Sequence, residues 1–201
     1  MILGITGSIG AGKSTVRDGF IALGWRFFDA DEICHEIYSS PDGVFAGRIA
    51  ERWGEDILTP EGGIDRKKLA AAVFGKPEEL QALTSMLYPE LERRLDQAVA
   101  GCRDAHVDGA FEIPLLFENG YESRFDKTLC VWCDSPIRYR RLREYRNFTD
   151  QEIAEREKYQ LPADEKLERA DYALVNNGSR ELLQKQIIYF SNMIREKAKN
   201  E

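Results

Sequence analysis

The chain has 201 residues, of which 43% are apolar and 31% charged, and its formal net charge at pH 7 is −7. These proportions are ordinary for folded proteins, so they exclude disordered and fibrous classes, and the length predicts one domain or one domain with a sizeable insertion. The acidic balance argues against a general nucleic-acid binder, because such proteins gather lysine and arginine against phosphates.

Five short apolar segments predict the strands of one sheet. The first covers residues 2–5 and is followed by a glycine-rich turn and a helical pattern over 13–23. Helical segments also separate the later strands, which indicates an α/β fold with a parallel sheet and helices on both faces. The other four predicted strands are 26–29, 106–113, 128–133 and 172–176.

A long helical segment separates the second predicted strand from the third. Residues 32–105 show helical periodicity, with breaks at 59–63 and 76–77. A crossover between parallel strands needs only about a dozen residues, so the excess indicates a subdomain that serves a ligand. We therefore expect a core made of residues 1–31 and 106–201 and an inserted helical subdomain over 32–105.

The strongest chemical signal is the glycine-rich turn after the first strand. Residues 7–15 read GSIGAGKST and satisfy GxxxxGK[ST] between a strand and a helix, the context of a phosphate-binding P-loop. Glycines let backbone N–H groups turn toward a phosphate, and the following helix adds the positive end of its dipole. In such a loop Lys13 reaches the β- and γ-phosphates and Ser14 offers its hydroxyl to Mg²⁺.

A P-loop does not by itself identify what receives the phosphate. A guanine-nucleotide switch would also carry DxxG and NKxD, and the sequence has neither pattern. A motor or transporter ATPase would usually be larger. The helical insertion and the modest length favour a kinase for a small molecule, and a non-catalytic nucleotide-binding switch stays open as the alternative.

Two aspartates follow the second predicted strand, in the sequence Asp29-Ala30-Asp31. The carboxyl ends of parallel strands meet the P-loop at one edge of the sheet, and a carboxylate there can orient an attacking hydroxyl or accept its proton. A local alternative is that one aspartate caps the helix beginning near Glu32. Both interpretations hold if one aspartate is catalytic and the other structural.

An arginine cluster stands out in this acidic chain. Residues 138–146 contain five arginines and one glutamate. Acidic residues would normally be interspersed on a solvated helix face, so we expect this cluster to meet a small polyanion.

Cysteine usage and hydropathy indicate the compartment. Cys130 and Cys133 form a CxxC within a predicted strand, where positions three apart face opposite ways, so we expect no metal or redox pair. No stretch approaches the roughly 18 apolar residues of a membrane span, and the start lacks the features of a signal peptide. We expect a cytoplasmic protein that binds neither membrane nor nucleic acid.

Five motifs together resemble the dephospho-coenzyme A kinase family. In chain order they are GSIGAGKST, DADEICHEIY, GGIDRKKL, EIPLLFENG and ERADYALVNNGS, and the resemblance extends from about residue 2 to about residue 180. The resemblance implies a P-loop kinase with a helical substrate-binding insertion and a lid over about 138–165. It also implies transfer of the γ-phosphoryl of ATP, with Mg²⁺, to the ribose 3′-hydroxyl of dephospho-CoA, giving coenzyme A and ADP.

The resemblance also implies roles for individual residues. Asp31 would be the base for the acceptor hydroxyl, and Glu112 would support the Mg²⁺ ion beside Ser14. One count along the chain gives Arg143 as the lid arginine on the transferring phosphoryl and another gives Arg141; we favour Arg143. The ATP-binding residues would be Gly10, Ala11, Gly12, Lys13, Ser14, Thr15, Arg141, Arg146 and Asn177.

The acceptor site is less sharply defined. The segment Pro114, Leu115, Leu116 and Phe117 would line a pocket for the adenosine end of the substrate, although its three last residues could equally pack in the core. Tyr88 stands where the family usually has histidine, so its hydroxyl would have to replace an imidazole contact, or Tyr88 is a core aromatic. Another nucleoside or nucleotide kinase is the remaining catalytic alternative.

Overall fold

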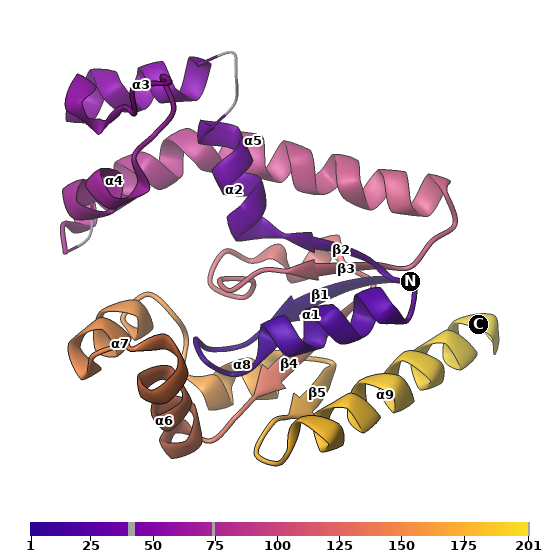
Figure 1. Cartoon of the computed structure of the whole chain (residues 1–201). Helices are drawn as coiled ribbons and strands as arrows, with labels where there is room; N and C mark the ends of the chain where they lie inside the picture. The colour runs from indigo at the N-terminus through magenta and orange to yellow at the C-terminus, as the bar shows by residue number, and fades with distance from the viewer. Residues whose placement is uncertain (40–42, 74, 201) are drawn as a thin grey trace. The chain divides into compact units, whose positions relative to one another are not determined.

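The computed structural model in Figure 1 describes residues 1–39, 43–73 and 75–200. The chain divides into two compact units, a sheet unit (Met1–Asp29 with Val99–Glu201) and a helical unit (Ala30–Ala98). The division expected from the sequence, with an insertion over 32–105, stays a prediction of domain organisation.

The sheet unit is built on five parallel strands in the order β2-β3-β1-β4-β5, which confirms the predicted α/β fold. Strand β1 lies between β3 and β4. The loop that follows β1 therefore emerges at the middle of the carboxyl edge, where open α/β sheets bind ligands. The strands are β1 (Ile2–Thr6), β2 (Arg26–Asp29), β3 (Gly109–Glu112), β4 (Lys127–Trp132) and β5 (Tyr172–Val175).

Helices cover both faces of this sheet, as strand alternation in β4 shows. Leu129 and Val131 are buried in the core cluster formed with α1 and α9, two helices that lie side by side in Figure 1. Trp132 points to the other face, where its indole N–H donates to Asp164 of α8 at 2.8 Å. The helices of this unit are α1 (Lys13–Ala22), η2 (Tyr121–Arg124), α6 (Ser135–Arg146), α7 (Asp150–Glu157), α8 (Ala163–Arg169) and α9 (Arg180–Asn200).

Strand β3 is shorter than the predicted segment 106–113. Helix α5 continues to Asp104, and the chain then turns, with His106 at a φ of 53° and the Val107 N–H bonded to the Cys102 carbonyl. The backbone N–H groups of this turn bond to the last turn of α5 and not to a neighbouring strand. Pairing of β3 with β1 therefore begins only at Gly109.

The helical unit holds most of the segment between β2 and β3. In it the Trp53 indole donates to Glu79 at 2.8 Å, which ties α3 to α5. On α5, hydrogen bonds from Arg93 and Arg94 lower the pKa of Glu90 to about 2. The helices are α2 (Ala30–Tyr38), α3 (Val44–Trp53), η1 (Glu55–Ile57), α4 (Arg66–Val73) and α5 (Pro77–Asp104), whose last residues belong to the sheet unit.

Across the described ranges, none of the helices combines the length and the apolar character that crossing a membrane requires.

Candidate active site

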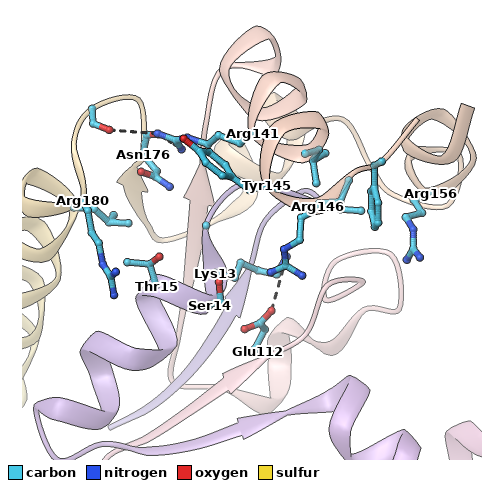
Figure 2. A pocket seen from close by; sticks show the side chains of 17 residues that line it. Lys13, Ser14, Thr15, Glu112, Arg141, Tyr145, Arg146, Arg156, Asn176 and Arg180 are labelled. Carbon is cyan, nitrogen blue, oxygen red and sulfur yellow. Dashed lines mark hydrogen bonds and ion pairs between the residues drawn. The ribbon is translucent and has the colours of Figure 1, made fainter. Parts of the chain in front are cut away.

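A pocket of about 960 Å³ opens beside the P-loop in the sheet unit, as Figure 2 shows. Its volume is within the range of small-molecule and cofactor sites. The lining residues come from the P-loop and α1 (Ile9, Gly10, Gly12, Lys13, Ser14, Thr15), from β3 (Glu112), from α6, α7 and their connection (Arg141, Leu142, Tyr145, Arg146, Phe148, Arg156), and from the segment after β5 (Asn176, Gly178, Arg180, Leu183).

The glycines of the P-loop are required by its backbone. Gly10 and Gly12 have φ values of 78° and 105°, in the left-handed region that favours glycine. A Cβ on Gly12 would also lie 2.2 Å from Nδ2 of Asn176. Glycine is therefore required at these positions for two reasons. The backbone adopts a conformation that disfavours other residues, and at Gly12 there is no room for a side chain.

Lys13 places a positive charge at the floor of the pocket. Its Nζ donates to the Gly7 carbonyl at 2.9 Å and lies 3.9 Å from a carboxylate oxygen of Glu112. Both side chains are largely buried, at 11% and 12% exposed. The lysine follows β1 and the glutamate ends β3, so the pairing of these two strands brings the charges together.

The arginine cluster divides into side chains with different surroundings. Arg141 and Arg146 of α6 line the pocket. Arg143 does not line it; its guanidinium is half exposed and pairs with Asp150 at 2.6 Å. Residues two apart on a helix point about 200° apart, so Arg143 cannot share the face of Arg141. The role of Arg143 as the phosphoryl contact stays a prediction of the sequence.

Arg141 also organises the chain after β5. Its two terminal nitrogens donate to the carbonyls of Asn176 and Gly178, at 2.8 and 3.3 Å. In Figure 2 this side chain, with Tyr145 from the same helix, lies above Lys13 and Glu112. The contacts hold one wall of the pocket in place, and Arg141 itself lines the cavity.

Asn177, which the resemblance places among the ATP-binding residues, does not line the pocket. Its amide exchanges hydrogen bonds with Asp134, whose backbone N–H and carboxylate are 2.9 and 2.8 Å away. The neighbouring Asn176 lines the pocket instead and donates to the Ala11 carbonyl. The side chains of adjacent residues in an extended segment point to opposite sides, which explains why only one of these two asparagines lines the pocket. The side chain of Ala11 is buried, and its backbone carbonyl accepts the hydrogen bond from Asn176.

The family model for dephospho-CoA kinase matches residues 1–181. The chain belongs to the dephospho-CoA kinase family. A dephospho-CoA kinase of Geobacillus kaustophilus is 37% identical over 189 residues, which are 94% of each chain. A solved Thermus thermophilus protein superimposes with a TM-score of 0.76 at 32% identity over 96% of this chain and 97% of its own. The fold is also that of a dephospho-CoA kinase from Campylobacter jejuni, with a TM-score of 0.70 at 23% identity over 96% of both chains.

The structure adds pocket residues that sequence reasoning on the family motifs missed. Tyr145 is 76% exposed, an unusual environment for a large aromatic side chain, and it faces the pocket from α6. Arg156 of α7 stacks over the Phe148 ring at 5.0 Å, and both line the pocket. A tyrosine within a basic segment is the signal that the sequence offers for Tyr145; Arg156 and Arg180 carry none.

The segment expected to contact the acceptor lies largely in the interior. Leu116 and Phe117 are 0% and 4% exposed, and the approach of Leu116 leaves no room for a Cβ on Gly4 of β1. For these two residues the structure agrees with the core-packing alternative. Pro114 and Leu115 are half-buried, and the Pro114 carbonyl accepts from Lys166 of α8.

Asp31 and Tyr88 belong to the helical unit. Asp31 is exposed in the first turn of α2. A carboxylate there also stabilises the helix, because its negative charge interacts favourably with the helix dipole. Tyr88 is half-buried on α5. Their roles as base and as substrate contact stay predictions of the sequence.

Proposed function

We propose that this chain transfers the γ-phosphoryl group of ATP to the ribose 3′-hydroxyl of dephospho-CoA, giving coenzyme A and ADP. The observation that carries the proposal is the pocket, in which the P-loop, Lys13 and the arginines of α6 and α7 face one cavity. Membership of the dephospho-CoA kinase family supplies the acceptor.

The charges of the pocket suit phosphoryl transfer, in which negative charge is spread over the oxygens of the transferred group. Lys13 and the N-terminus of α1 lie on the P-loop side, and Arg141, Arg146 and Arg156 supply positive charge from α6 and α7. An arginine in such a position contributes roughly 10³–10⁵ in rate in other phosphoryl-transfer enzymes. The reaction needs little covalent work from the protein beyond this electrostatic stabilisation and positioning.

Ser14 and Glu112 fit a Mg²⁺ ion bound together with the nucleotide. Both line the pocket and present oxygen atoms, the ligands this ion prefers. Over the described part of the chain no three His, Cys, Asp or Glu side chains gather as a metal cage, and Mg²⁺ usually completes its shell with water and substrate phosphates. The ion would neutralise charge on the phosphates. A chelator should stop the transfer, and added Mg²⁺ should restore it.

Asp31 is the proposed base. Asp31 is the second residue after β2, in the first turn of α2, and its side chain is exposed. There it would orient the 3′-hydroxyl and accept its proton as the phosphoryl group is transferred.

A coupled ADP-release assay with MgATP tests the function. The acceptors are dephospho-CoA, AMP, adenosine and a blank without acceptor. We expect turnover with dephospho-CoA, loss of that turnover in Lys13→Ala, and unchanged turnover in the control Lys185→Ala on the exposed face of α9. Turnover on another acceptor alone would make the chain a different nucleoside or nucleotide kinase, and ATP binding without any turnover would favour a switch.

A further inference from the structure

Both backbone polar groups of Ile9, in the P-loop, are held by side chains from distant segments. The Ile9 N–H donates to Oε1 of Gln160 at 3.2 Å. The Ile9 carbonyl accepts from Nη1 of Arg138 at 3.0 Å. Ile9 lines the pocket, whereas neither Arg138 nor Gln160 does. Any influence of these two side chains on the nucleotide must therefore pass through the P-loop.

Arg138 is held firmly in place. Its side chain is 3% exposed, and Nη1 also donates to Glu157 of α7 at 2.5 Å. Nη2 donates to Ser135 at 3.2 Å. The guanidinium lies over the Tyr139 ring at 4.9 Å, and the Tyr139 hydroxyl donates to the second oxygen of Glu157 at 2.7 Å. A buried charge is tolerated only when it is paired in this way, so α6 and α7 together determine where Arg138 lies.

Helix α6 also packs directly on the P-loop backbone at the next residue. A Cβ on Gly10 would lie 2.7 Å from Cγ of Leu142 and 3.0 Å from Cγ of Arg138. The two hydrogen bonds at Ile9 and this close approach at Gly10 fix the same stretch of loop. A movement of α6 would change the direction of the loop amides that follow.

We propose that Arg138 and Gln160 are positioning residues of the nucleotide site. They hold the P-loop at Ile9 and Gly10 in the conformation that binds phosphate, and they join it to α6 and α7, which carry the pocket arginines. Phosphate binding by the loop therefore depends on the positions of α6 and α7, and thus on the placement of those arginines. The ligand class, a nucleoside triphosphate, rests on the proposed function.

The test measures MgATP binding by calorimetry, and the KM of each substrate, in Arg138→Met and Gln160→Leu. Each variant removes a hydrogen-bond partner of Ile9 and leaves every pocket side chain in place. We expect ATP affinity to fall about tenfold or more, as the loss of such bonds implies. The KM for dephospho-CoA should stay within about twofold of the wild-type value. Gln160→Leu carries the test alone if Arg138→Met does not fold.

Arg195→Met is a matched control. Arg195 donates to the Leu23 carbonyl at 3.1 Å and to Asp108 at 2.7 Å, and it lies over the Trp25 ring at 5.4 Å. It thus has the same three kinds of partner as Arg138, and none of them lines the pocket. We expect it to lower the melting temperature without changing ATP affinity.

Equal ATP affinity in wild type, Arg138→Met and Gln160→Leu would overturn the proposal. So would a loss no greater than that in Arg195→Met, because it would reflect general destabilisation. Since ATP binding is measured without any acceptor, a failure of dephospho-CoA as substrate would leave this result interpretable, and the two proposals can fail separately.

Discussion

The side-chain amide of Asn176 donates a hydrogen bond to the backbone carbonyl of Ala11, with Nδ2 and the oxygen 2.8 Å apart. The asparagine follows β5 and is 7% exposed, so this bond joins the last strand of the sheet to the P-loop in a buried position. The same Nδ2 occupies the space in which Gly12 would need to place a Cβ. The P-loop conformation therefore depends on a residue 165 positions away in the sequence.

The contact with Asn176 predicts that Gly12→Ala strongly weakens nucleotide binding. The new methyl group would meet Nδ2 at 2.2 Å, and alanine at a φ of 105° is strained by about 1–2 kcal/mol. We expect MgATP affinity, measured by calorimetry, to fall at least about a hundredfold. Gly24→Ala is the matched control, because Gly24 also has positive φ but has no atom within 4 Å of the added carbon. Similar ATP affinity in the two variants would contradict this explanation.

The pocket arginines predict unequal effects of two substitutions on one helix. Arg146→Ala removes a positive charge from the pocket lining, whereas Arg143→Ala removes a surface ion pair with Asp150. We expect kcat to fall about a hundredfold or more in the first variant and to change less than about threefold in the second. Steady-state kinetics with saturating substrates compares them, and the reverse order would support Arg143 as the phosphoryl contact.

The proposed base predicts a loss of turnover without a loss of binding. Asp31→Asn keeps the size of the side chain but cannot accept the proton of the 3′-hydroxyl, so kcat should fall roughly 10²–10⁴-fold. ATP affinity should change little, because the nucleotide pocket lies in the sheet unit. Glu32→Gln, in the same first turn of α2, controls for the lost charge. Undiminished kcat in Asp31→Asn would remove this residue from the mechanism.

Burial raises the pKa of the Cys130 thiol to about 11, from an ordinary value of 9.0. Between pH 9 and 11 the unfolded chain ionises this thiol while the folded protein keeps it protonated, so the free energy of unfolding must fall as pH rises. The expected loss is on the order of 2 kcal/mol. Urea unfolding of wild type and Cys130→Ala at several pH values checks this. A decline equally steep in the variant would show that Cys130 does not contribute.

Much of the fold is predictable because its signals are local. Apolar runs bounded by turns placed all five strands, and the P-loop motif identified the turn after β1. The predicted third strand is longer than the observed one. An apolar run does not show that the Val107 N–H bonds to the Cys102 carbonyl and so belongs to the end of the preceding helix. Such a bond depends on where the preceding helix stops.

The candidate site was less predictable because its side chains acquire their partners across the fold. The arginines of α6 are alike in sequence, yet Arg138 is buried against Glu157 and Arg143 pairs with Asp150, whereas Arg141 faces the pocket. Neither the helical phase of α6 nor the position of α7 can be read from the arginine cluster alone. A resemblance to a family locates motifs well, but it does not show which of two neighbouring asparagines, Asn176 or Asn177, lines the pocket.

The proposed function is best tested by identifying the phosphorylated product. Wild-type protein would be incubated with MgATP and dephospho-CoA, and the product analysed by mass spectrometry and phosphorus NMR. We expect one added phosphoryl group on the ribose 3′-oxygen, in a product identical to authentic coenzyme A and formed in step with ADP. A phosphoryl group at another position, or ADP formed without any phosphorylated acceptor, would contradict it.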